Sequence, residues 1–408
     1  METFDVIVVG AGMAGASVAA EASSHARVLL LEREEQPGYH ATGRSAAAFI
    51  PSYGYENPAL RTLTLCSHDF LAKPPAIFQV ETLLHRRGLL SLCPPGGATA
   101  FEQQFNSVQK HFPTISRVDR EAIRQHIPIV KDDYSALGSF ESEVSDIDVH
   151  ALHEGYLRAF RHQGGSLLSK VNISSLIHRA GCWRVETSHG VYSAPLLVNA
   201  AGAWADELAQ LAGVNAIGLT PLRRTAVLLE PPAGCDVSQW PLVMAADGSF
   251  YLKPDAGVIL ASPADEHPSP ACDAQPEEID IAFAVDFVEK ALQLQVRQVK
   301  HSWAGLRSFV ADRTPVIGFD PRSEGFFWLV GQGGHGIQIA PAASRLASAL
   351  LLGNAVPDDL QAIGFQPEWV WPKRFNSTGS VDATHNSPTK QYNTTTMGYH
   401  NNEESYNA

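Results

Sequence analysis

Residues 4–15, FDVIVVGAGMAG, decide the fold. Phe4–Val9 is an apolar, largely β-branched run, as a parallel strand buried on both faces requires. A glycine-rich turn and an alanine-rich stretch with helical character follow, and Arg27–Leu31 (RVLLL) then has the pattern of a second buried strand. We predict one strand–helix–strand unit of the dinucleotide-binding type, because these elements succeed one another within about 30 residues.

The glycines of the turn have the spacing Gly10-x-Gly12-x-x-Gly15, and Glu32 ends the second strand 22 residues after Gly10. In this arrangement Gly10 permits the tight turn, Gly12 lets the backbone approach a pyrophosphate, and Gly15 allows close helix–strand packing. The helix N-terminus attracts phosphates, and the Glu32 carboxylate can accept hydrogen bonds from ribose hydroxyls. A glycine-rich turn without a ligand is the alternative, and it fits the whole unit less well.

Two further segments favour FAD over NAD. Residues 38–48, GYHATGRSAAA, offer Thr42, Arg44, Ser45 and several backbone amides, which a site for NAD alone would not need. Near the other end of the chain, residues 331–336, GQGGHG, precede a predicted helix whose dipole favours negative charge, as on a reduced flavin. A simple strand–helix connection is the alternative interpretation of this second turn.

The remaining pattern predicts an α/β protein. Residues 148–162 have apolar side chains at helical spacing, and residues 215–310 alternate like antiparallel strands. Further strands are predicted at Ser166–Val171, Leu196–Asn199, Thr225–Leu229, Ser249–Lys253, Val258–Ser262 and Phe326–Val330, and a last helix at Ala342–Leu352. Residues 376–408 are rich in polar side chains with few aliphatic ones, so we expect a disordered polar tail there.

Composition and charge restrict the classes of partner. The 408 residues carry a net charge of −13, which opposes binding to nucleic acid or to an anionic membrane surface, since both require a basic face. The sequence contains no apolar run of about 18 residues, so we predict no transmembrane segment. A core strand begins within the first few residues, which argues against a signal peptide. We therefore expect a cytoplasmic protein, or one bound peripherally at the inner membrane.

Metal and hydrolase chemistry find little support in the sequence. The five cysteines are scattered without a CxxC pair, and the sixteen histidines lack carboxylates at ligand spacing. No G-x-S-x-G motif is present to supply a nucleophilic serine. We predict free thiols and no metal site.

Six segments in one order resemble the FAD-dependent D-amino-acid dehydrogenases of the D-amino-acid oxidase and glycine oxidase superfamily, above all the D-arginine dehydrogenases. They are residues 1–15, GYHATGRSAA (38–47), LVNAAGAWAD (197–206), FYLKPDAG (250–257), WAGLRSFVAD (303–312) and QGGHGIQ (332–338). The resemblance covers residues 1–372. It implies a discontinuous Rossmann-like FAD-binding domain in residues 1–88, 146–213 and 312–372, and an antiparallel-sheet substrate domain, the roof over the flavin, in residues 89–145 and 214–311.

The resemblance also implies which residues contact FAD. Besides Gly10, Gly12 and Gly15 of the first turn, they are Ala14, Glu32, Arg33, Ala41, Thr42, Gly43, Arg44, Ser45, Ala46, Ala47, Ala48, Val171, Gly202, Gly333, Gly334, His335, Gly336, Ile337 and Gln338. Among these, Val171 is expected to meet the adenine through its backbone.

Three residues match the carboxylate-binding set of that family: Arg224 in LRRTAVLL, Tyr251 in SFYLK and Arg307 in WAGLRSF. An arginine fork binds a carboxylate through two parallel hydrogen bonds, so the match implies an α-amino acid as substrate. A surface charge is the alternative for Arg224, and a packed aromatic ring for Tyr251. Arg307 is flanked by apolar residues, where an unpaired charge would be costly.

Tyr53 matches a lid tyrosine of the family, which would exclude water during the reaction. Gly334 and His335 lie in the second glycine-rich turn, and His335 is a candidate polar contact to the substrate where the family has a tyrosine.

At three positions the chain departs from the D-arginine dehydrogenases. Leu89 and Gly248 stand where those enzymes have acidic residues, and Ala48 stands where they have a histidine. Leu89 would then line the site for the substrate side chain. Because a buried cation without its acidic partner is costly, we predict a shift toward D-amino acids with neutral or apolar side chains.

The reaction that the resemblance implies is oxidative deamination. With the carboxylate held, a hydride passes from Cα to flavin N5, and the imino acid hydrolyses to a 2-oxo acid and ammonia without a side-chain base. A flavin-dependent 2-hydroxy-acid dehydrogenase and a secondary-amine oxidase of the glycine or sarcosine type stay open, as does an NAD-binding or non-catalytic protein. The electron acceptor stays open between a quinone and another carrier.

Overall fold

The computed structural model describes residues 1–375, and the first long strand, β2 (Val6–Val9), lies in the middle of a six-stranded sheet. The strand order is β10 (Ser166–Leu168), β3 (Val28–Leu31), β2, β14 (Leu196–Asn199), β22 (Phe326–Val330) and β21 (Val316–Phe319). Neighbouring strands are parallel except β21, which is antiparallel to β22. All residues of β2, β3 and β22 are buried, as expected for a parallel sheet covered on both faces.

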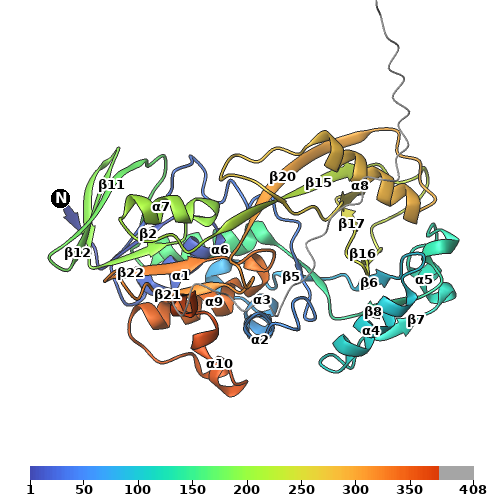
Figure 1. The fold of residues 1–408 in the computed structure, drawn as a ribbon, viewed down its shortest axis with the longest axis horizontal. Coiled ribbons are helices and arrows are strands. Elements are labelled where there is room, and N and C mark those ends of the chain that lie inside the picture. Colours follow the sequence, from blue (N-terminus) through green and yellow to red (C-terminus); the bar gives the residue numbers. More distant parts are fainter. Residues whose placement is uncertain (376–408) are drawn as a thin grey trace, which may run out of the picture. The chain divides into compact units, whose positions relative to one another are not determined.

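Alternate residues of β2 enter two separate cores, as the two-residue period of a strand requires. Val6 and Val8 pack in the core formed with α1 (Met13–Ser23), α6 (Val149–His162) and α9 (Gly336–Leu351), which lie together in Figure 1. Ile7 and Val9 pack in the other core. A four-stranded sheet also contributes to that core, and its order is β1 (Glu2–Thr3), β13 (Gly190–Ala194), β12 (Cys182–Thr187) and β11 (Ile173–Arg179).

The other large sheet has nine strands. Its order is β19 (His267–Pro268), β15 (Thr220–Leu229), β18 (Val258–Ser262), β17 (Tyr251–Asp255), β16 (Leu242–Ala245), β6 (Leu89–Leu92), β8 (Gly138–Glu141) and β7 (Ser116–Val118), and β20 (Val299–Phe309) pairs with β15. The prediction of an antiparallel sheet is confirmed for all pairs but one, since β6 and β16 run parallel. In Figure 1 the helix α8 (Glu278–Ala291) lies beside the long strands β15 and β20.

A small fourth sheet contains β4 (Ala48–Phe49), β9 (Ser145–Ile147) and β5 (Leu84–Arg86). The other α-helices are α2 (Pro58–Leu65), α3 (His68–Ala72), α4 (Ala98–Gln109), α5 (Arg120–His126), α7 (Ala205–Leu211) and α10 (Asp358–Ala362). Every strand of the six-stranded sheet comes from residues 1–88, 146–213 or 312–372, and every strand of the nine-stranded sheet from residues 89–145 or 214–311. Together these elements form the α/β fold expected of a Rossmann-like FAD-binding part with a second, substrate-binding part.

The predicted strands at Leu196–Asn199, Val258–Ser262 and Phe326–Val330 are confirmed to the residue. The strand predicted over Phe4–Val9 is β2, which starts at Val6 rather than Phe4. The strand predicted over 166–171 ends at Leu168, because Lys170 adopts a left-handed backbone conformation, with φ of 59°, that a strand cannot contain.

Two helices differ from the prediction: α9 starts earlier than predicted, and α8 was not predicted. Helix α9 begins at Gly336, six residues before the predicted start, because Pro341 within it removes only one intrahelical hydrogen bond. Helix α8 falls in the region predicted to hold only strands. Its buried positions, Asp280, Ala284, Val288 and Ala291, have helical spacing, which is a signal present in the sequence.

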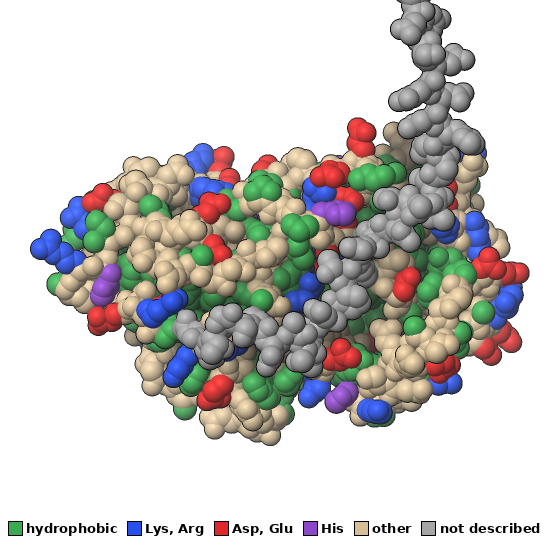
Figure 2. All heavy atoms as spheres, viewed as in Figure 1, with side chains coloured by type: hydrophobic (Ala, Val, Ile, Leu, Met, Phe, Trp, Pro, Cys, Tyr) green, Lys and Arg blue, Asp and Glu red, His purple; other side chains and the backbone are tan. Residues whose placement is uncertain are grey.

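On the face shown in Figure 2, basic and acidic side chains are interspersed. Within residues 1–375 no helix is long and apolar enough to cross a membrane. The five cysteines are free thiols. The polar tail predicted for residues 376–408 lies outside the described part of the chain.

Candidate functional site

A cavity of about 660 Å³ is lined by residues from both large sheets. The six-stranded sheet contributes the carboxyl ends of β2, β3 and β22 with the loops that follow them, and the nine-stranded sheet contributes β15, β16, β17 and β20. Ligands bind at the carboxyl ends of strands in open α/β sheets, and this volume is in the usual range for a cofactor and substrate site.

The first glycine-rich turn forms one wall of the cavity. Gly10 has φ of +99°, and a Cβ there would lie 2.5 Å from the Ala200 carbonyl oxygen. A Cβ on Gly15 would lie 1.7 Å from the Gly10 carbonyl oxygen. Only glycine therefore allows α1 to start this close to β2. The Thr42 hydroxyl accepts a hydrogen bond from the Met13 amide (2.9 Å), which ties the loop at 38–48 to the start of α1.

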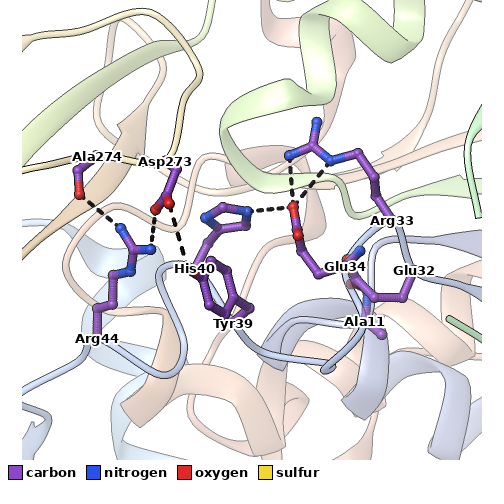
Figure 3. Close-up of polar contacts among 9 residues, drawn as sticks. All are labelled: Ala11, Glu32, Arg33, Glu34, Tyr39, His40, Arg44, Asp273 and Ala274. Carbon is purple, nitrogen blue, oxygen red and sulfur yellow. Dashed lines mark hydrogen bonds and ion pairs between the residues drawn. The ribbon is translucent and has the colours of Figure 1, made fainter. Parts of the chain in front are cut away.

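The Glu32 carboxylate is held in place at the end of β3. It accepts hydrogen bonds from the backbone amides of Ala11 (2.7 Å) and Glu34 (2.9 Å), and it lines the cavity beside the glycine turn. Figure 3 shows Glu32 next to Ala11. A carboxylate fixed in this way retains acceptor capacity for ligand hydroxyl groups.

His153 is a residue that the sequence analysis missed. Its Nε2 donates to the Ala11 carbonyl (2.9 Å), and its ring lies so close to Gly38 that a Cβ there would be 2.9 Å from Cε1. Burial lowers the pKa of His153, so the neutral ring supports the glycine turn and the loop at 38–48 together. Its position on the buried face of α6 is the signal that the sequence offers.

Arg44 lines the cavity, but protein groups occupy its guanidinium. It donates to the carbonyl oxygen of Ala274 (2.9 Å) and forms an ion pair with Asp273 (Figure 3). It also donates to the carbonyl oxygen of Ala304 (3.0 Å). The hydrogen bond from Arg44 lowers the pKa of Asp273. These contacts tie the loop at 38–48 to the segment that follows β19.

Near this ion pair, Arg33 and His40 also line the cavity. The Arg33 guanidinium lies 4.3 Å from the ring centroid of Trp204, and His40 Nε2 lies 2.9 Å from a Glu34 carboxylate oxygen. The hydrogen bond from His40 lowers the pKa of Glu34. In Figure 3 the Glu34 carboxylate lies between His40 and Arg33.

Arg224 and Arg307 come from the paired strands β15 and β20 and both line the cavity. Arg224 donates through Nε to the Asp265 carbonyl (2.7 Å) and through Nη2 to the Glu266 carboxylate (3.1 Å). Within residues 1–375, by contrast, the Arg307 guanidinium has no hydrogen-bond or ion-pair partner. A partly buried cation without a partner is a strong site for an anion.

The pKa shifts show that the arginines interact with the groups around them at this end of the cavity. Burial would lower the pKa of Arg307, but the charges of Tyr53, Tyr251, Glu266 and Asp265 outweigh it and raise that pKa. Burial and the charge of Arg307 lower the pKa of Arg224. Burial alone would raise the pKa of Tyr251, but the charges of Arg307 and Arg224 outweigh it and lower that pKa. The two nearby acids are already engaged, since Glu266 also pairs with Arg313 (2.9 Å) and Asp265 accepts from Thr225. The arrangement therefore suits a substrate carboxylate.

Arg223, the neighbour of Arg224, does not line the cavity. It forms ion pairs with Glu277 and with the buried Asp280 (3.1 Å) instead. Alternate residues of a strand point to opposite faces, which explains why only one of the two arginines lines the cavity.

The structure brings most of the predicted contacts together. Those that line the cavity are Gly10, Gly12, Ala14, Glu32, Arg33, Ala41, Thr42, Arg44, Ser45, Ala46, Ala47, Ala48, Tyr53, Val171, Gly202, Arg224, Tyr251, Arg307, Gly333, Gly334, Gly336, Ile337 and Gln338. Gly15, Gly43, Leu89 and His335 lie outside the lining. Leu89 is buried behind it in a cluster with Ile50 and Leu242, and His335 is buried behind Tyr53.

An apolar wall beside Tyr251 is the other part that the sequence analysis missed. Ile50, Leu242 and Met244 line the cavity, and Met244 lies opposite Tyr251 in the β16–β17 pair. Leu242 and Met244 are two residues apart and therefore share one face of β16. Their alternation is a weak signal in the sequence, because it does not tell which face meets a ligand.

The residues present fit FAD. The glycine turn with the N-terminus of α1, the fixed Glu32 carboxylate, the loop at 38–48 and the second glycine-rich turn all line one cavity, as a dinucleotide with an attached flavin ring needs. Within the described residues, no group of three or more His, Cys, Asp or Glu side chains could hold a metal ion.

Comparisons with known proteins agree with this fit. The model of a family described as FAD dependent oxidoreductase, DAO, matches residues 5–350. Among curated proteins, the chain is 27% identical to glycine oxidase from Pseudomonas aeruginosa, over 86% of this chain and 95% of the relative.

Solved structures share the fold. Glycine oxidase from Geobacillus kaustophilus has a TM-score of 0.76 at 19% identity, covering 90% of this chain and 99% of the other. L-Proline dehydrogenase from P. horikoshii also has a TM-score of 0.76 at 19% identity, covering 92% and 98% of the two chains.

Proposed function

The chain belongs to the FAD dependent oxidoreductase family, and on that premise we propose that it oxidises D-amino acids with neutral or apolar side chains to 2-oxo acids and ammonia. One observation carries the proposal: among residues 1–375 the guanidinium of Arg307 has no hydrogen-bond or ion-pair partner, and it lies in the same cavity as the glycine turn that fits FAD. An α-carboxylate bound there would bring Cα into the flavin-binding cavity. The choice of the D enantiomer rests on the resemblance to D-amino-acid dehydrogenases.

The proposed side-chain class rests on the walls of the cavity. The acidic residues that line it, Glu32 and Glu207, both come from the Rossmann-like part, and none comes from the nine-stranded sheet. The nine-stranded sheet instead offers Leu242 and Met244, with Leu89 buried behind them. A cationic side chain would have no acid to pair with there, whereas an apolar one would bury its surface.

The chain's own residues supply position rather than acid–base chemistry. FAD, when bound, supplies the two-electron acceptor. Arg224, Arg307 and Tyr251 hold the carboxylate and so orient the bond that is oxidised. Tyr53 lines the same cavity, and as a lid it would exclude water. No carboxylate or imidazole of the nine-stranded sheet lines the cavity, so the amine would lose its proton to solvent.

A secondary-amine oxidase of the glycine type is the second candidate, and the glycine oxidase among the curated relatives favours it. It would use the same carboxylate clamp. A 2-hydroxy-acid dehydrogenase would use that clamp as well. The three differ in the group on Cα that is oxidised.

Anaerobic reduction of the bound flavin tests the proposal. The purified protein is mixed with D- and L-leucine, D-methionine, D-phenylalanine, D-arginine, glycine, sarcosine and D- and L-lactate, and the loss of flavin absorbance is followed. We expect fast reduction by D-leucine, D-methionine or D-phenylalanine. Reduction by glycine or sarcosine alone would replace the proposal with the second candidate, and reduction by lactate alone would point to hydroxy acids.

A further inference from the structure

The turn at residues 50–54, which carries Tyr53, is held by both large parts of the molecule. The Ile50 amide donates to the Gln338 side chain (3.1 Å) on α9, and the Ser52 amide donates to the Glu141 carboxylate (3.2 Å) on β8. The Tyr53 amide donates back to the Ile50 carbonyl (3.0 Å). These bonds fix the backbone of the turn, but they leave the direction of the Tyr53 ring to other contacts.

His335 supplies that contact. Its ring is stacked on the Tyr53 ring, with centroids 4.2 Å apart and an interplanar angle of 18°. The histidine is 8% exposed and does not line the cavity. Its Nε2 has no hydrogen-bond partner among the described residues and faces Gly54, where a Cβ would lie 2.7 Å away. The ring is therefore placed to pack against Tyr53 and not to touch the substrate.

The other end of the Tyr53 ring reaches the carboxylate site. A Cβ added to Gly334 would lie 3.1 Å from the Tyr53 hydroxyl and 3.0 Å from Arg307 Nη1. The hydroxyl and the guanidinium thus converge on the same glycine, which leaves room for both. A shift of the Tyr53 ring would move its hydroxyl away from the Arg307 guanidinium.

We propose that His335 is a positioning residue that acts through its stack on Tyr53 and keeps the Tyr53 hydroxyl beside Arg307. This inference deepens the proposed function and rests on it for the identity of the bound carboxylate. The imidazole nitrogens take no part, so a benzene ring can replace the histidine. The environment is consistent with this role, since burial and the charges of Arg307 and Arg313 lower the pKa of His335 to about 3 and keep the ring neutral.

The test compares His335→Ala, which removes the stack, with His335→Phe, which keeps a flat ring. The readouts are the Kd of the flavoprotein for benzoate, followed by the change in flavin absorbance, and the separate kcat and KM for the best amino acid. An aromatic pair contributes about 0.5–1.5 kcal/mol, so we expect His335→Ala to raise the Kd and KM by about 2- to 12-fold. His335→Phe should stay within about two-fold of the unchanged protein.

His126→Ala is the matched control. His126 is stacked on Phe140 with centroids 4.3 Å apart and an angle of 20°, and neither residue lines the cavity. Loss of that stack should leave the benzoate Kd unchanged. Flavin content and the melting temperature of each variant show whether the protein is folded.

A double-mutant cycle with Tyr53→Ala decides how His335 acts. If it acts through Tyr53, then His335→Ala adds no further loss in the Tyr53→Ala background. An equal loss in His335→Phe and His335→Ala would overturn the inference, because the nitrogens would then matter. No loss in either variant would overturn it as well.

The inference and the proposed function fail separately. If no D-amino acid reduces the flavin but the benzoate results are as expected, only the proposed function is wrong. If D-amino acids reduce the flavin and His335→Ala binds benzoate normally, only the role of His335 is wrong.

Discussion

The two halves of the cavity differ in one charged group, since Arg224 in the second half is also paired, with Glu266. In the half that fits FAD, Arg44 and Glu32 already have protein partners: Arg44 binds Asp273 and two carbonyls, and Glu32 accepts two backbone amides. In the half built on the nine-stranded sheet, Arg307 has none among the described residues. Groups that are already paired keep their positions without a ligand, whereas the proposed carboxylate clamp at Arg307 would gain a partner only when an anion binds.

The largest effect is expected where charge is unpaired. Arg307→Leu should lower kcat/KM for the best D-amino acid by about 10³-fold, because the carboxylate loses a charged, forked partner in a partly buried site. Arg307→Lys keeps the charge but not the forked guanidinium, so its kcat/KM should lie between those of the unchanged protein and Arg307→Leu. Both variants should retain flavin, measured by absorbance per protein. An unchanged KM in Arg307→Leu would show that the carboxylate binds at other residues.

The choice among substrates is expected to be the next largest effect. D-Leucine, D-methionine or D-phenylalanine should exceed D-arginine by about 10²-fold in kcat/KM, because a cationic side chain would lie against Leu242 and Met244 without an acid. Leu89→Glu would restore an acid near that wall and should narrow the ratio. A dominant preference of the unchanged protein for D-arginine would contradict the apolar site.

Two glycine substitutions sharpen the comparison from the side of the cofactor. Gly15→Ala places a Cβ 1.7 Å from the Gly10 carbonyl oxygen, so α1 must move and unfolding of the flavin-free protein should become easier by about 1–3 kcal/mol. Gly12→Ala meets only the Thr42 hydroxyl at 3.3 Å. Gly12→Ala should leave the free energy of unfolding of the flavin-free protein unchanged. It should raise the Kd for FAD about ten-fold, as measured by titration. An equal loss of unfolding free energy in Gly15→Ala and Gly12→Ala would contradict the separate roles of the two glycines.

The smallest effect is expected at the ion pair of Arg44 and Asp273. Asp273 is about half exposed, so Asp273→Asn should cost only about 0–1 kcal/mol of unfolding free energy at neutral pH. Its pKa is lowered by Arg44, so the contribution is complete above the ordinary value of 3.8 and disappears as the pH falls through the lowered pKa. Denaturant unfolding at pH 7 and pH 3 would measure this, and a larger loss at the lower pH would contradict it.

The sequence was informative where the signal was local. Strands β14 and β22 are continuous apolar runs buried on both faces, so their ends were clear, and the glycine spacing predicted a turn whose close contacts the structure bears out. Contacts between distant segments left no such trace. His153 meets Ala11 across 142 residues, and the parallel pairing of β6 with β16 joins segments far apart in the chain.

The site shows the same division. Motif resemblance led to Arg224, Tyr251 and Arg307, all of which line the cavity. It could not show that Arg44 is already occupied, because Asp273 lies 229 residues away. Nor could it separate His335, behind Tyr53, from Gly334, which lines the cavity, although the two are adjacent in sequence.

The position of β22 in the six-stranded sheet has a consequence for synthesis on the ribosome. Strand β14 pairs with β2 on one side and with β22, more than 120 residues later, on the other. Until residue 330 has emerged from the ribosome, β22 cannot pair with β14. A nascent chain that has formed the earlier strands then has one edge of the apolar strand β14 without a hydrogen-bonded partner. Such an edge invites pairing with other chains, so a polypeptide stopped before β22 should aggregate rather than form a smaller flavin-binding protein.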